Sequence, residues 1–423
     1  MMIYRFSIRR INTIVGVKNT FLFLFLTMIS CGNCKKTEEI SNQTSVETKE
    51  IKISEPIKTG ADNSQAYLPI LKDKKVGIVT NQTGILSNKT HLVDFLIEKK
   101  INLQKIYAPE HGFRGTADAG ELIKDGKDTK TGLPIVSLYG NNKKPKPEQL
   151  AGIDVMIFDL QDVGARFYTY ISSLHYVMEA CAENNIPLIV LDRPNPNGGI
   201  VDGPILEKEH TSFVGMHQIP ILHGMTIGEY AKMINGEKWL NPSTSSEQVK
   251  QCKLEIITCL NYNRNMQYDL LAKPSPNLPN SQAINLYASL CLFEGTNISV
   301  GRGTEMQFQI YGSPYLKNTG FSFTPKPNFG AKDPVWNGKE CFGEDLTKIE
   351  KVNRLELKWL IKAYKENSET KNPFFNDFFI KLAGTKKLQQ QIESGVSETE
   401  IRKSWEKGLE DFKTMREKYL IYK

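Results

Sequence analysis

Four short, mostly apolar runs, each followed at once by a polar loop, constrain the fold of this chain more than any other feature. They are rich in β-branched and large apolar residues and cover residues 76–79, 103–107, 155–158 and 188–191. Runs of this kind are typical of strands buried on both faces of a parallel sheet. Segments with helical periodicity separate them, among them residues 90–100 and 172–185. Strand, helix and strand at this spacing predict βαβ units and an α/β fold with a mainly parallel sheet.

The polar loops after these runs predict a site at one edge of the sheet. They are Thr80–Gly84, Ala108–Gly115, Asp159–Arg166 and Asp192–Gly199. Because parallel strands end at the same edge, the four loops should converge, and open α/β sheets bind their ligands there. The loop after the second run carries Glu110, His111 and Arg114 within five positions. An acid, an imidazole and a cation so close together favour chemistry at this loop.

The first residues have the features of a secretory signal. Residues 1–30 contain four basic and no acidic side chains, and the apolar stretch 21–29 is too short to span a bilayer. Ser30 precedes Cys31, an arrangement that resembles a bacterial lipobox, although Met28 stands where leucine is usual. We expect residues 1–30 to be a lipoprotein signal peptide and Cys31 to be the lipid attachment site. An ordinary signal peptide cut nearby is the alternative.

Charge and composition set the expected partners. Loss of residues 1–30 would lower the formal net charge from +7 to +3, since that segment holds four basic and no acidic residues. There is no basic stripe with interleaved aromatic residues, so nucleic acid is not an expected partner. Residues 31–65 are rich in Ser, Thr, Glu and Lys, and they are predicted to be a flexible tether. The expected location is the cell envelope, at the periplasmic face or the cell surface.

The remaining length predicts two domains, at residues 66–270 and 271–423. At the proline-rich segment 274–279 the α/β pattern ends. Beyond it, short strands are predicted near Phe321 and Cys341, followed by polar helices. The last helix is expected to begin at the capping box Ser397-x-x-Glu400. It carries apolar residues at helical spacing, which are predicted to be core: Ile401, Trp405, Leu409, Phe412 and Met415.

Several classes of site are not supported by motifs. No glycine-rich nucleotide motif follows a predicted strand, and there is no nucleophile elbow. The histidines show no spacing typical of zinc ligands, so no metal and no cofactor is expected. Five cysteines beyond the tether lack metal-ligand spacing and are expected to be buried free thiols: Cys181, Cys252, Cys259, Cys291 and Cys341. The carboxylates, amides, arginines and tyrosines that remain at the sheet edge suit a sugar.

Seven blocks of sequence, in order, resemble one known family. They are Thr80–Gly84, Pro109–Gly112, Asp159–Gly164, Arg166–Tyr170, Asp192–Pro196, Phe293–Asn297 and Gly301–Thr304. The chain is similar in these blocks to the exo-acting β-N-acetylmuramidases of glycoside hydrolase family 171, formerly a domain of unknown function. The resemblance spans residues 76–315 and continues more weakly to the C-terminus. It implies a Rossmann-like, doubly wound domain, a smaller α+β C-terminal domain and an active site in the cleft between them.

The resemblance also implies an activity and one catalytic residue. Family members release N-acetylmuramic acid from the non-reducing end of peptidoglycan fragments, during cell-wall turnover and recycling. Glu110 matches the glutamate regarded as catalytic, and we expect it to act as general acid or as another direct participant. Pairing with Arg114 is the alternative role. Asp162 is the preferred second carboxylate, with Glu294 and Asp159 as rivals. His111 is expected to orient Glu110 or to bind a hydroxyl, unless it is merely structural.

Substrate binding needs groups for the lactyl carboxylate, the sugar ring and the acetamido group. A guanidinium suits the carboxylate, and the candidates are Arg166, Arg193 and Arg302. Tyr168 and Tyr170 are candidates for the walls around the ring, with a place in the aromatic core as the alternative. The remaining candidates for substrate contact are Asn81, Gln82, Asn195 and Glu294.

Two other classes of function stay open. One is a non-catalytic lipoprotein that binds muropeptides in the same cleft. The other is a metal-assisted hydrolase, such as a deacetylase of cell-wall sugars, with Glu110, His111 and Asp162 as ligands. The presence of the family's glutamate disfavours the first class, and the dispersed histidines disfavour the second.

Overall fold

The computed structural model of the protein describes residues 55–423 except for residues 111, 115–124, 241–250 and 370. The described residues belong to one compact unit. Its larger sheet has the strand order β3-β4-β2-β1-β5-β6-β7. All neighbouring strands in it are parallel except β3 and β4. The strands are β1 Val76–Thr80, β2 Leu103–Ala108, β3 Gly126–Lys127, β4 Pro134–Ser137, β5 Val155–Asp159, β6 Leu188–Leu191 and β7 Leu254–Ile257.

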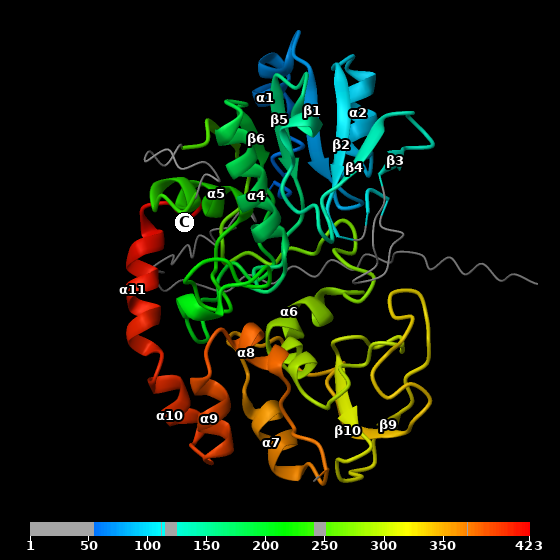
Figure 1. Ribbon diagram of the computed structural model, residues 1–423, viewed down its shortest axis with the longest axis vertical. Helices are drawn as coiled ribbons and strands as arrows, with labels where there is room; N and C mark the ends of the chain where they lie inside the picture. The colour runs from blue at the N-terminus through cyan, green and yellow to red at the C-terminus, as the bar shows by residue number, and fades with distance from the viewer. Residues whose placement is uncertain (1–54, 111, 115–124, 241–250, 370) are drawn as a thin grey trace, which may run out of the picture. The chain divides into compact units, whose positions relative to one another are not determined.

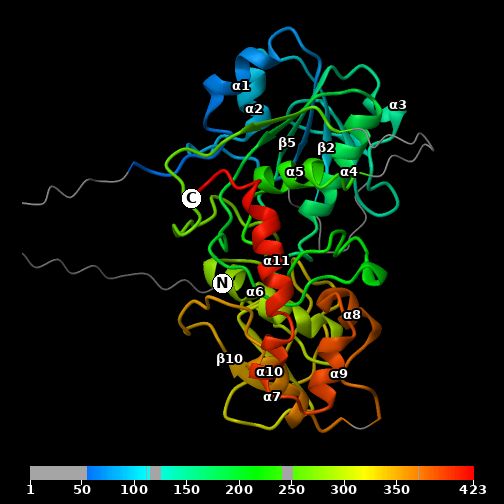
Figure 2. The same ribbon diagram turned by 90° about the vertical axis from the view of Figure 1, so that its left-hand side faces the viewer.

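Helices cover both faces of this sheet. Ile78 and Ile157 pack in one apolar cluster with α1 (Ser64–Leu71) and α2 (Leu92–Glu98). Their neighbours Val79 and Phe158 point to the opposite face, which α4 (Tyr170–Glu183) and α5 (Ile227–Gly236) cover. Figure 2 shows α1 and α2 on one side of the strands and α4 and α5 on the other. Because successive side chains of a strand point to opposite faces, burial of both faces explains the continuous apolar runs. The predicted doubly wound α/β fold is confirmed.

The strand order places a switch point in the middle of the sheet. The chain passes from β1 to β2 on one side and later to β5 on the other side of β1. In open α/β sheets, the crevice at the carboxyl ends of strands next to such a point is the usual ligand site. The strand ends face the middle of the molecule, toward α6 (Ser281–Leu290) (Figure 1).

A smaller antiparallel sheet and a group of helices follow α6. The strand order is β8-β10-β9, with β8 Ile310–Ser313, β9 Ser322–Phe323 and β10 Cys341–Asp345. The short strands predicted near Phe321 and Cys341 are confirmed. The shorter elements are α3 Pro147–Leu150, η1 Lys208–His210 and η2 Cys291–Gly295. The last helices are α7 Lys358–Glu366, α8 Asp377–Ala383, α9 Lys387–Glu393, α10 Glu398–Lys403 and α11 Glu406–Glu417.

The last predicted helix is two helices in the structure. Its capping box is present, since Ser397 accepts from the Glu400 amide while the Glu400 carboxylate accepts from that of Ser397. The helix breaks after Lys403, where the Ser404 hydroxyl donates to the Ile401 carbonyl at 2.6 Å. A hydroxyl that bonds the carbonyl of the preceding turn competes with the helical ladder. The predicted core residues of this segment are buried, apart from Met415, which is partly buried.

The chain's last residues return to the larger sheet. The Tyr422 hydroxyl donates to Asp192 Oδ2 at 2.8 Å, directly after β6. The backbone amides of Ile421 and Tyr422 donate to Glu229 Oε1 in α5. Figure 1 shows α11 running from the lower helices toward α5. The C-terminal part therefore packs on the sheet as well as on its own strands, and the domain boundary at residue 270 stays a prediction.

The packed region begins earlier than the predicted end of the tether at residue 65. Lys58 and Leu260 exchange two backbone hydrogen bonds beside β7, and Thr59 and Ala61 are buried. A polar composition did not reveal this, because the segment is held by backbone pairing rather than by large apolar side chains. The part of the tether before residue 55, together with the signal segment and Cys31, lies outside the described residues.

The expectation for the cysteines is confirmed. All five that follow the tether are free and buried. Among the described residues, no helix combines the length and the apolar character that a membrane crossing requires.

Candidate active site

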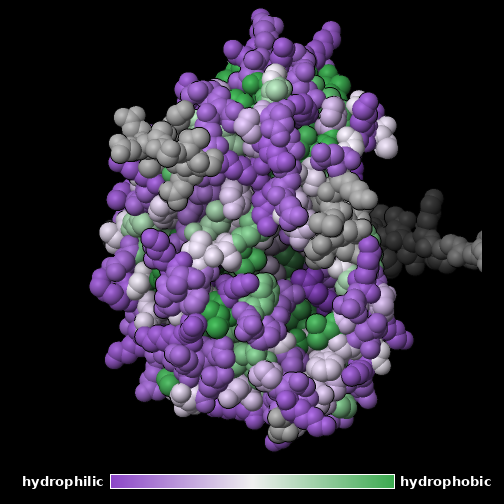
Figure 3. All heavy atoms as spheres, viewed as in Figure 1, coloured by the Kyte–Doolittle hydropathy of each residue, from purple (hydrophilic) through white to green (hydrophobic). Residues whose placement is uncertain are grey.

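One pocket brings together Glu110 and Arg302. It lies at the carboxyl edge of the larger sheet and has about 430 Å³ of empty space, including its open mouth. The residues that line it are Glu110, Phe167, Tyr168, Thr169, Tyr170, Ser275, Leu278, Tyr287, Arg302 and Phe308. Figure 3 shows a mostly hydrophilic surface with hydrophobic patches around its hollowed middle part. Residues before and after position 271 build the pocket jointly, as expected for a cleft between two parts of the chain.

Glu110 is held in the loop that follows β2. Pro109 stops the strand, and Gly112 turns the loop with a φ of 74°, which favours glycine. The Tyr139 hydroxyl donates to Glu110 Oε1 at 3.1 Å, and the Thr169 hydroxyl lies 3.3 Å from Oε2. The alternative partner Arg114 makes a two-pronged bond with Asp128 instead. These contacts place Glu110 at the pocket wall, and the described hydrogen-bond partner of Arg114 is Asp128.

Arg302 enters the pocket from the loop after η2. Its Nε lies 2.6 Å from Glu294 Oε1, and its guanidinium lies 5.0 Å from the centre of the Phe308 ring. About a quarter of the Arg302 side chain is exposed. Gly301 and Gly303 flank it with φ values of 77° and 80°, and a Cβ on Gly303 would lie 2.6 Å from the Lys326 carbonyl. The loop therefore requires glycine on both sides of Arg302, which holds the cation at this place.

Aromatic side chains form the rest of the wall. The rings of Tyr168 and Tyr170 meet edge to face at 4.9 Å, and Tyr287 lies 5.0 Å from Phe308. Burial raises the pKa of the Tyr168 and Tyr170 hydroxyls, so both stay neutral. Tyr168 donates to the Pro274 carbonyl at 2.7 Å. These rings give the pocket apolar faces with fixed polar edges, as sugar rings require.

Two predicted amide contacts support the wall from behind. Asn81 Nδ2 donates to the Tyr170 hydroxyl at 2.5 Å. Gln82 Nε2 donates to the carbonyls of Lys273 and Pro274 at 3.2 and 3.3 Å. Neither amide lines the pocket. Asn81 holds Tyr170, which does, and Gln82 holds the two residues that precede the lining residue Ser275.

Two of the three candidate arginines point elsewhere. Arg166 is fully buried, and its guanidinium donates to four backbone carbonyls, those of Pro204, Ile219, Leu382 and Ala383. Two of these carbonyls end α8, where the helix dipole favours a cation. Arg193 is buried against Asp159, with contacts of 2.6 and 3.0 Å. The expectation that Arg166 or Arg193 binds a ligand in the pocket has no support from their positions, because neither lines the pocket and both guanidinium groups are bonded inside the protein.

Asn195 also has an internal role in the structure. Its Nδ2 donates to the Met225 carbonyl at 2.9 Å, and its Oδ1 accepts from the Asn197 amide at 2.8 Å. The side chain is buried and does not line the pocket. The predicted contact of Asn195 with substrate therefore has no support from its position.

The carboxylates proposed beside Glu110 differ in their surroundings. Asp159 pairs with Arg193, and Glu294 pairs with Arg302. Asp162 is buried and does not line the pocket. Its Oδ2 accepts from the Gly164 amide at 2.7 Å, and its Oδ1 has no hydrogen-bond partner among the described residues.

Burial raises the pKa of Asp162 to about 7. The nearby His223 offers little compensation, since burial lowers the pKa of its imidazole to about 3 and its Nε2 lies 3.9 Å from Asp162 Oδ2. A carboxyl with a raised pKa in the folded state favours folding while it is protonated. That advantage is present at low pH and is lost as pH rises from about 4 through about 7.

Asp162→Asn should therefore flatten the pH dependence of stability. We expect the free energy of unfolding of the variant to exceed that of the wild type at pH 8 by on the order of 1–3 kcal/mol, and to match it more closely at pH 4.5. Urea unfolding at both pH values measures the difference. Equal pH slopes in the two proteins would contradict the raised pKa. If the variant keeps its fold but loses activity, Asp162 would again be the candidate for the second catalytic carboxylate.

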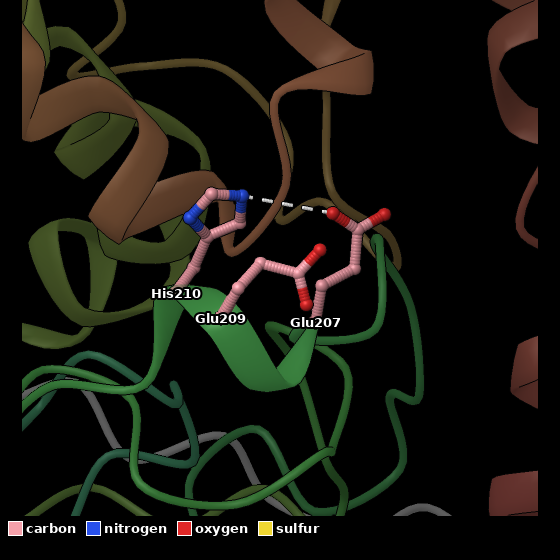
Figure 4. A group of neighbouring side chains, drawn as sticks. All are labelled: Glu207, Glu209 and His210. Atoms are coloured by element: carbon pink, nitrogen blue, oxygen red, sulfur yellow. Dashed lines mark ion pairs between the residues drawn. The ribbon is translucent and has the colours of Figure 1, made fainter.

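The residues proposed as metal ligands do not form a described cluster. His111 lies outside the described residues, and Asp162 is absent from the wall that carries Glu110. Within the part of the chain that the structure describes, the group close enough to share a metal ion is Glu207, Glu209 and His210, at η1 (Figure 4). It is largely exposed, and none of its members lines the Glu110 pocket.

Comparison with known families accounts for nearly all of the chain from residue 76 onward. The sequence pattern of the N-terminal part of the exo-β-N-acetylmuramidase NamZ family matches residues 76–282, and that of its C-terminal part matches residues 285–422. The chain belongs to the NamZ family. Leu278 and Tyr287, on either side of the join between the two matches, both line the pocket.

A curated relative and two solved structures support the assignment to the NamZ family. The peptidoglycan β-N-acetylmuramidase NamZ of Bacillus subtilis (strain 168) is 38% identical over 428 residues, which cover 95% of this chain and 98% of that protein. A crystal structure of a DUF1343 family protein from Bacteroides fragilis has a TM-score of 0.79 and 43% identity, covering 87% and 99% of the two chains. A second protein of that bacterium has a TM-score of 0.74 and 30% identity over the same shares.

Sequence reasoning did not single out Tyr139, Thr169, Tyr287 and Phe308 in this NamZ-family site. Thr169 lies inside one of the resembling blocks, so its position was a signal that was not used. Tyr139 follows the short strand β4 (Pro134–Ser137). The parallel pairing of β4 with β2 brings it to Glu110. Tyr287 and Phe308 reach the pocket through packing of α6 and the loop after η2, which no local pattern indicates.

Proposed function

We propose that the protein is an exo-acting β-N-acetylmuramidase, a glycoside hydrolase that releases N-acetylmuramic acid from the non-reducing end of peptidoglycan fragments. Membership of the NamZ family and the likeness to the Bacillus subtilis enzyme support the activity. The observation that carries the proposal is that Glu110 and Arg302 meet in one pocket with aromatic walls. The reaction serves turnover and recycling of the cell wall.

Glu110 supplies the acid chemistry in this proposal. A carboxylic acid at the wall donates its proton to the glycosidic oxygen, so that the leaving sugar departs as a neutral alcohol. Tyr168 and Tyr170 limit the space around the ring, and their hydroxyls stay neutral beside the developing positive charge. The pocket therefore offers an acid on one wall and aromatic surface on another.

Arg302 supplies the selectivity. Muramic acid differs from glucosamine by a lactyl ether with a carboxylate, and a guanidinium forms strong two-pronged bonds with such a group. Of the three arginines that were candidates, Arg302 is the one that lines the pocket. Its partner Glu294 holds it in place and shares the cation with the incoming carboxylate.

Incubation with a disaccharide tests the proposed activity. The substrate carries N-acetylmuramic acid at its non-reducing end, linked β-1,4 to N-acetylglucosamine, and the assay runs with and without EDTA. We expect both free sugars to appear at equal rates with and without the chelator. Binding without any release would point to a muropeptide-binding protein. Release of acetate that EDTA abolishes would point to a metal-assisted deacetylase.

The proposal includes a lipid anchor at Cys31 and a place at the cell envelope. Cys31 follows Ser30 directly after the apolar stretch 21–29, as a lipobox cysteine does. Cys31→Ala should move the full-length protein from the membrane fraction to the soluble fraction, because a lipid-modified cysteine is the proposed attachment. Fractionation of cells followed by detection of the protein measures this. Full retention of the variant in membranes would show that another feature anchors it.

A further inference from the structure

Two hydroxyl groups from different loops hold the Glu110 carboxyl. Tyr139 follows β4, and its hydroxyl donates to Glu110 Oε1 at 3.1 Å. Thr169 is the N-cap of α4, yet its side chain makes no capping hydrogen bond, and its hydroxyl lies 3.3 Å from Glu110 Oε2. An N-cap threonine usually bonds a free amide of its own helix. Thr169 instead faces the carboxyl group at the pocket wall.

The register of the sheet explains why Tyr139 reaches Glu110. β2 and β4 are adjacent and parallel, and Ala108 pairs with Ser137. Glu110 and Tyr139 both stand two residues beyond this pair, and the Leu138 amide continues the pairing with a bond to the Ala108 carbonyl at 2.8 Å. The contact is therefore set by the main chain of two neighbouring strands rather than by the flexibility of either side chain.

The loop that carries Tyr139 is itself fixed. The Tyr139 amide donates to the Ser137 hydroxyl at 3.3 Å. Asn142 Nδ2 donates to the Ser137 carbonyl at 2.6 Å. The ring of Tyr139 is half-buried. A donor held by such contacts loses little freedom when it bonds the carboxyl, which is what a positioning group requires.

Tyr139 acts as a hydrogen-bond donor to Glu110. Burial and the negative charge of Glu110 raise the pKa of the Tyr139 hydroxyl, so Tyr139 keeps its proton. The Thr169 hydroxyl donates to the other carboxyl oxygen, Oε2, and Thr169 lines the pocket. The two donors together set the orientation of the carboxyl group at the pocket wall.

We propose that Tyr139 is a positioning residue of the reaction: it orients the Glu110 carboxyl toward the substrate. This rests on the proposed function, in which Glu110 is the acid. Tyr139 does not line the pocket, so it acts through Glu110 and not by contact with the sugar. Thr169 holds the other carboxyl oxygen.

Tyr139→Phe tests the proposal, because it removes the hydroxyl and keeps the ring. We expect kcat on the muramyl disaccharide to fall roughly 10- to 100-fold, the usual effect of one hydrogen bond to a charged group, with KM changed less than about twofold. Thr169→Val should show a smaller fall in kcat.

The matched control is Tyr419→Phe. Tyr419 donates to Glu237 Oε1 at 2.6 Å, so this variant removes the same kind of tyrosine–glutamate bond outside the pocket wall. It should leave kcat and KM unchanged. A second test places Tyr139→Phe in Glu110→Gln protein. A residue that acts only through Glu110 should cost nothing further there, whereas an unchanged penalty would overturn the positioning role.

A spectroscopic measurement separates failure of this inference from failure of the proposed function. In protein labelled with ¹³C at glutamate carboxyls, the Glu110 resonance is identified by its loss in Glu110→Gln. We expect this resonance to shift in Tyr139→Phe and to stay in place in Tyr419→Phe, whether or not the disaccharide is hydrolysed. An unshifted resonance would overturn the inference even in an active enzyme. An inactive wild type with a shifted resonance would overturn only the proposed function.

Discussion

Glu110→Gln should lower turnover of the muramyl disaccharide by about two to four orders of magnitude, the usual share of general acid–base catalysis. Glutamine keeps the shape of the side chain and can still accept the Tyr139 hydrogen bond, but it has no carboxylic proton to give. The fold and the binding of the disaccharide should survive, because the contacts of Glu110 lie at the pocket wall and not in the apolar core. Single-turnover rates and equilibrium binding of the same disaccharide measure the two effects separately.

Glu237→Gln is the control for this variant. Glu237 also accepts a tyrosine hydroxyl, from Tyr419, but it does not line the pocket. Its turnover should equal that of the wild type. A Glu110→Gln protein that hydrolyses the disaccharide at the wild-type rate would remove Glu110 as the acid and would make Glu294, which lies next to the pocket on Arg302, the first candidate.

The sequence was sufficient for the parts of the fold that depend on local pattern. The apolar runs predicted β1, β5 and β6 because both faces of those strands are buried, so that polar residues appear only where β1 and β5 end. The capping box predicted the start of α10, because its two hydrogen bonds involve residues three apart. The break between α10 and α11 was not predicted, since helical spacing of apolar residues continues across Ser404.

A site residue could be predicted only where its neighbours in the sequence determine its role. The loop after β2 identified Glu110, because a strand end, a proline and a glycine are neighbours there. The structure places Arg166, the first choice, away from the pocket for a long-range reason: two of its partners, Leu382 and Ala383, lie more than 200 residues later in the chain. No local pattern shows whether an arginine donates to a ligand or to distant carbonyls.

Burial of Asp162 is a similar case. Asp162 lies in the loop after β5, within one of the blocks that resemble the family. By sequence position alone it could therefore reach the site at the edge of the sheet. In the structure it is buried, beside Gly164 and His223. The depth of a loop residue depends on what packs over it, and its neighbours in sequence do not show this. Sequence predicts which loops reach a site more reliably than which side chains reach its surface.

Selectivity for muramic acid should depend on Arg302. We expect its guanidinium to bind the lactyl carboxylate. With a substrate that lacks this group, Arg302 keeps only its pair with Glu294, and one charge-assisted hydrogen bond is lost. Such a bond contributes about 1.5–3 kcal/mol, so its loss should cost roughly 10- to 150-fold in kcat/KM. Because the Arg302 side chain is about a quarter exposed, solvent weakens the interaction, and the lower half of this range is the expected result.

The measurement is the ratio of kcat/KM for chromogenic β-muramyl and β-glucosaminyl substrates. The wild type should prefer the muramyl substrate, and Arg302→Met should narrow the ratio by roughly 10- to 50-fold, through loss of rate on the muramyl substrate alone. Arg354→Met is the matched control, because Arg354 Nε also lies 2.6 Å from a glutamate oxygen, that of Glu356, and neither residue lines the pocket. If Arg302→Met leaves the ratio unchanged, Arg302 does not bind the lactyl carboxylate.

Equal rates of the wild type on both sugars would overturn the muramidase proposal itself, since the lactyl group is the feature that distinguishes muramic acid from glucosamine.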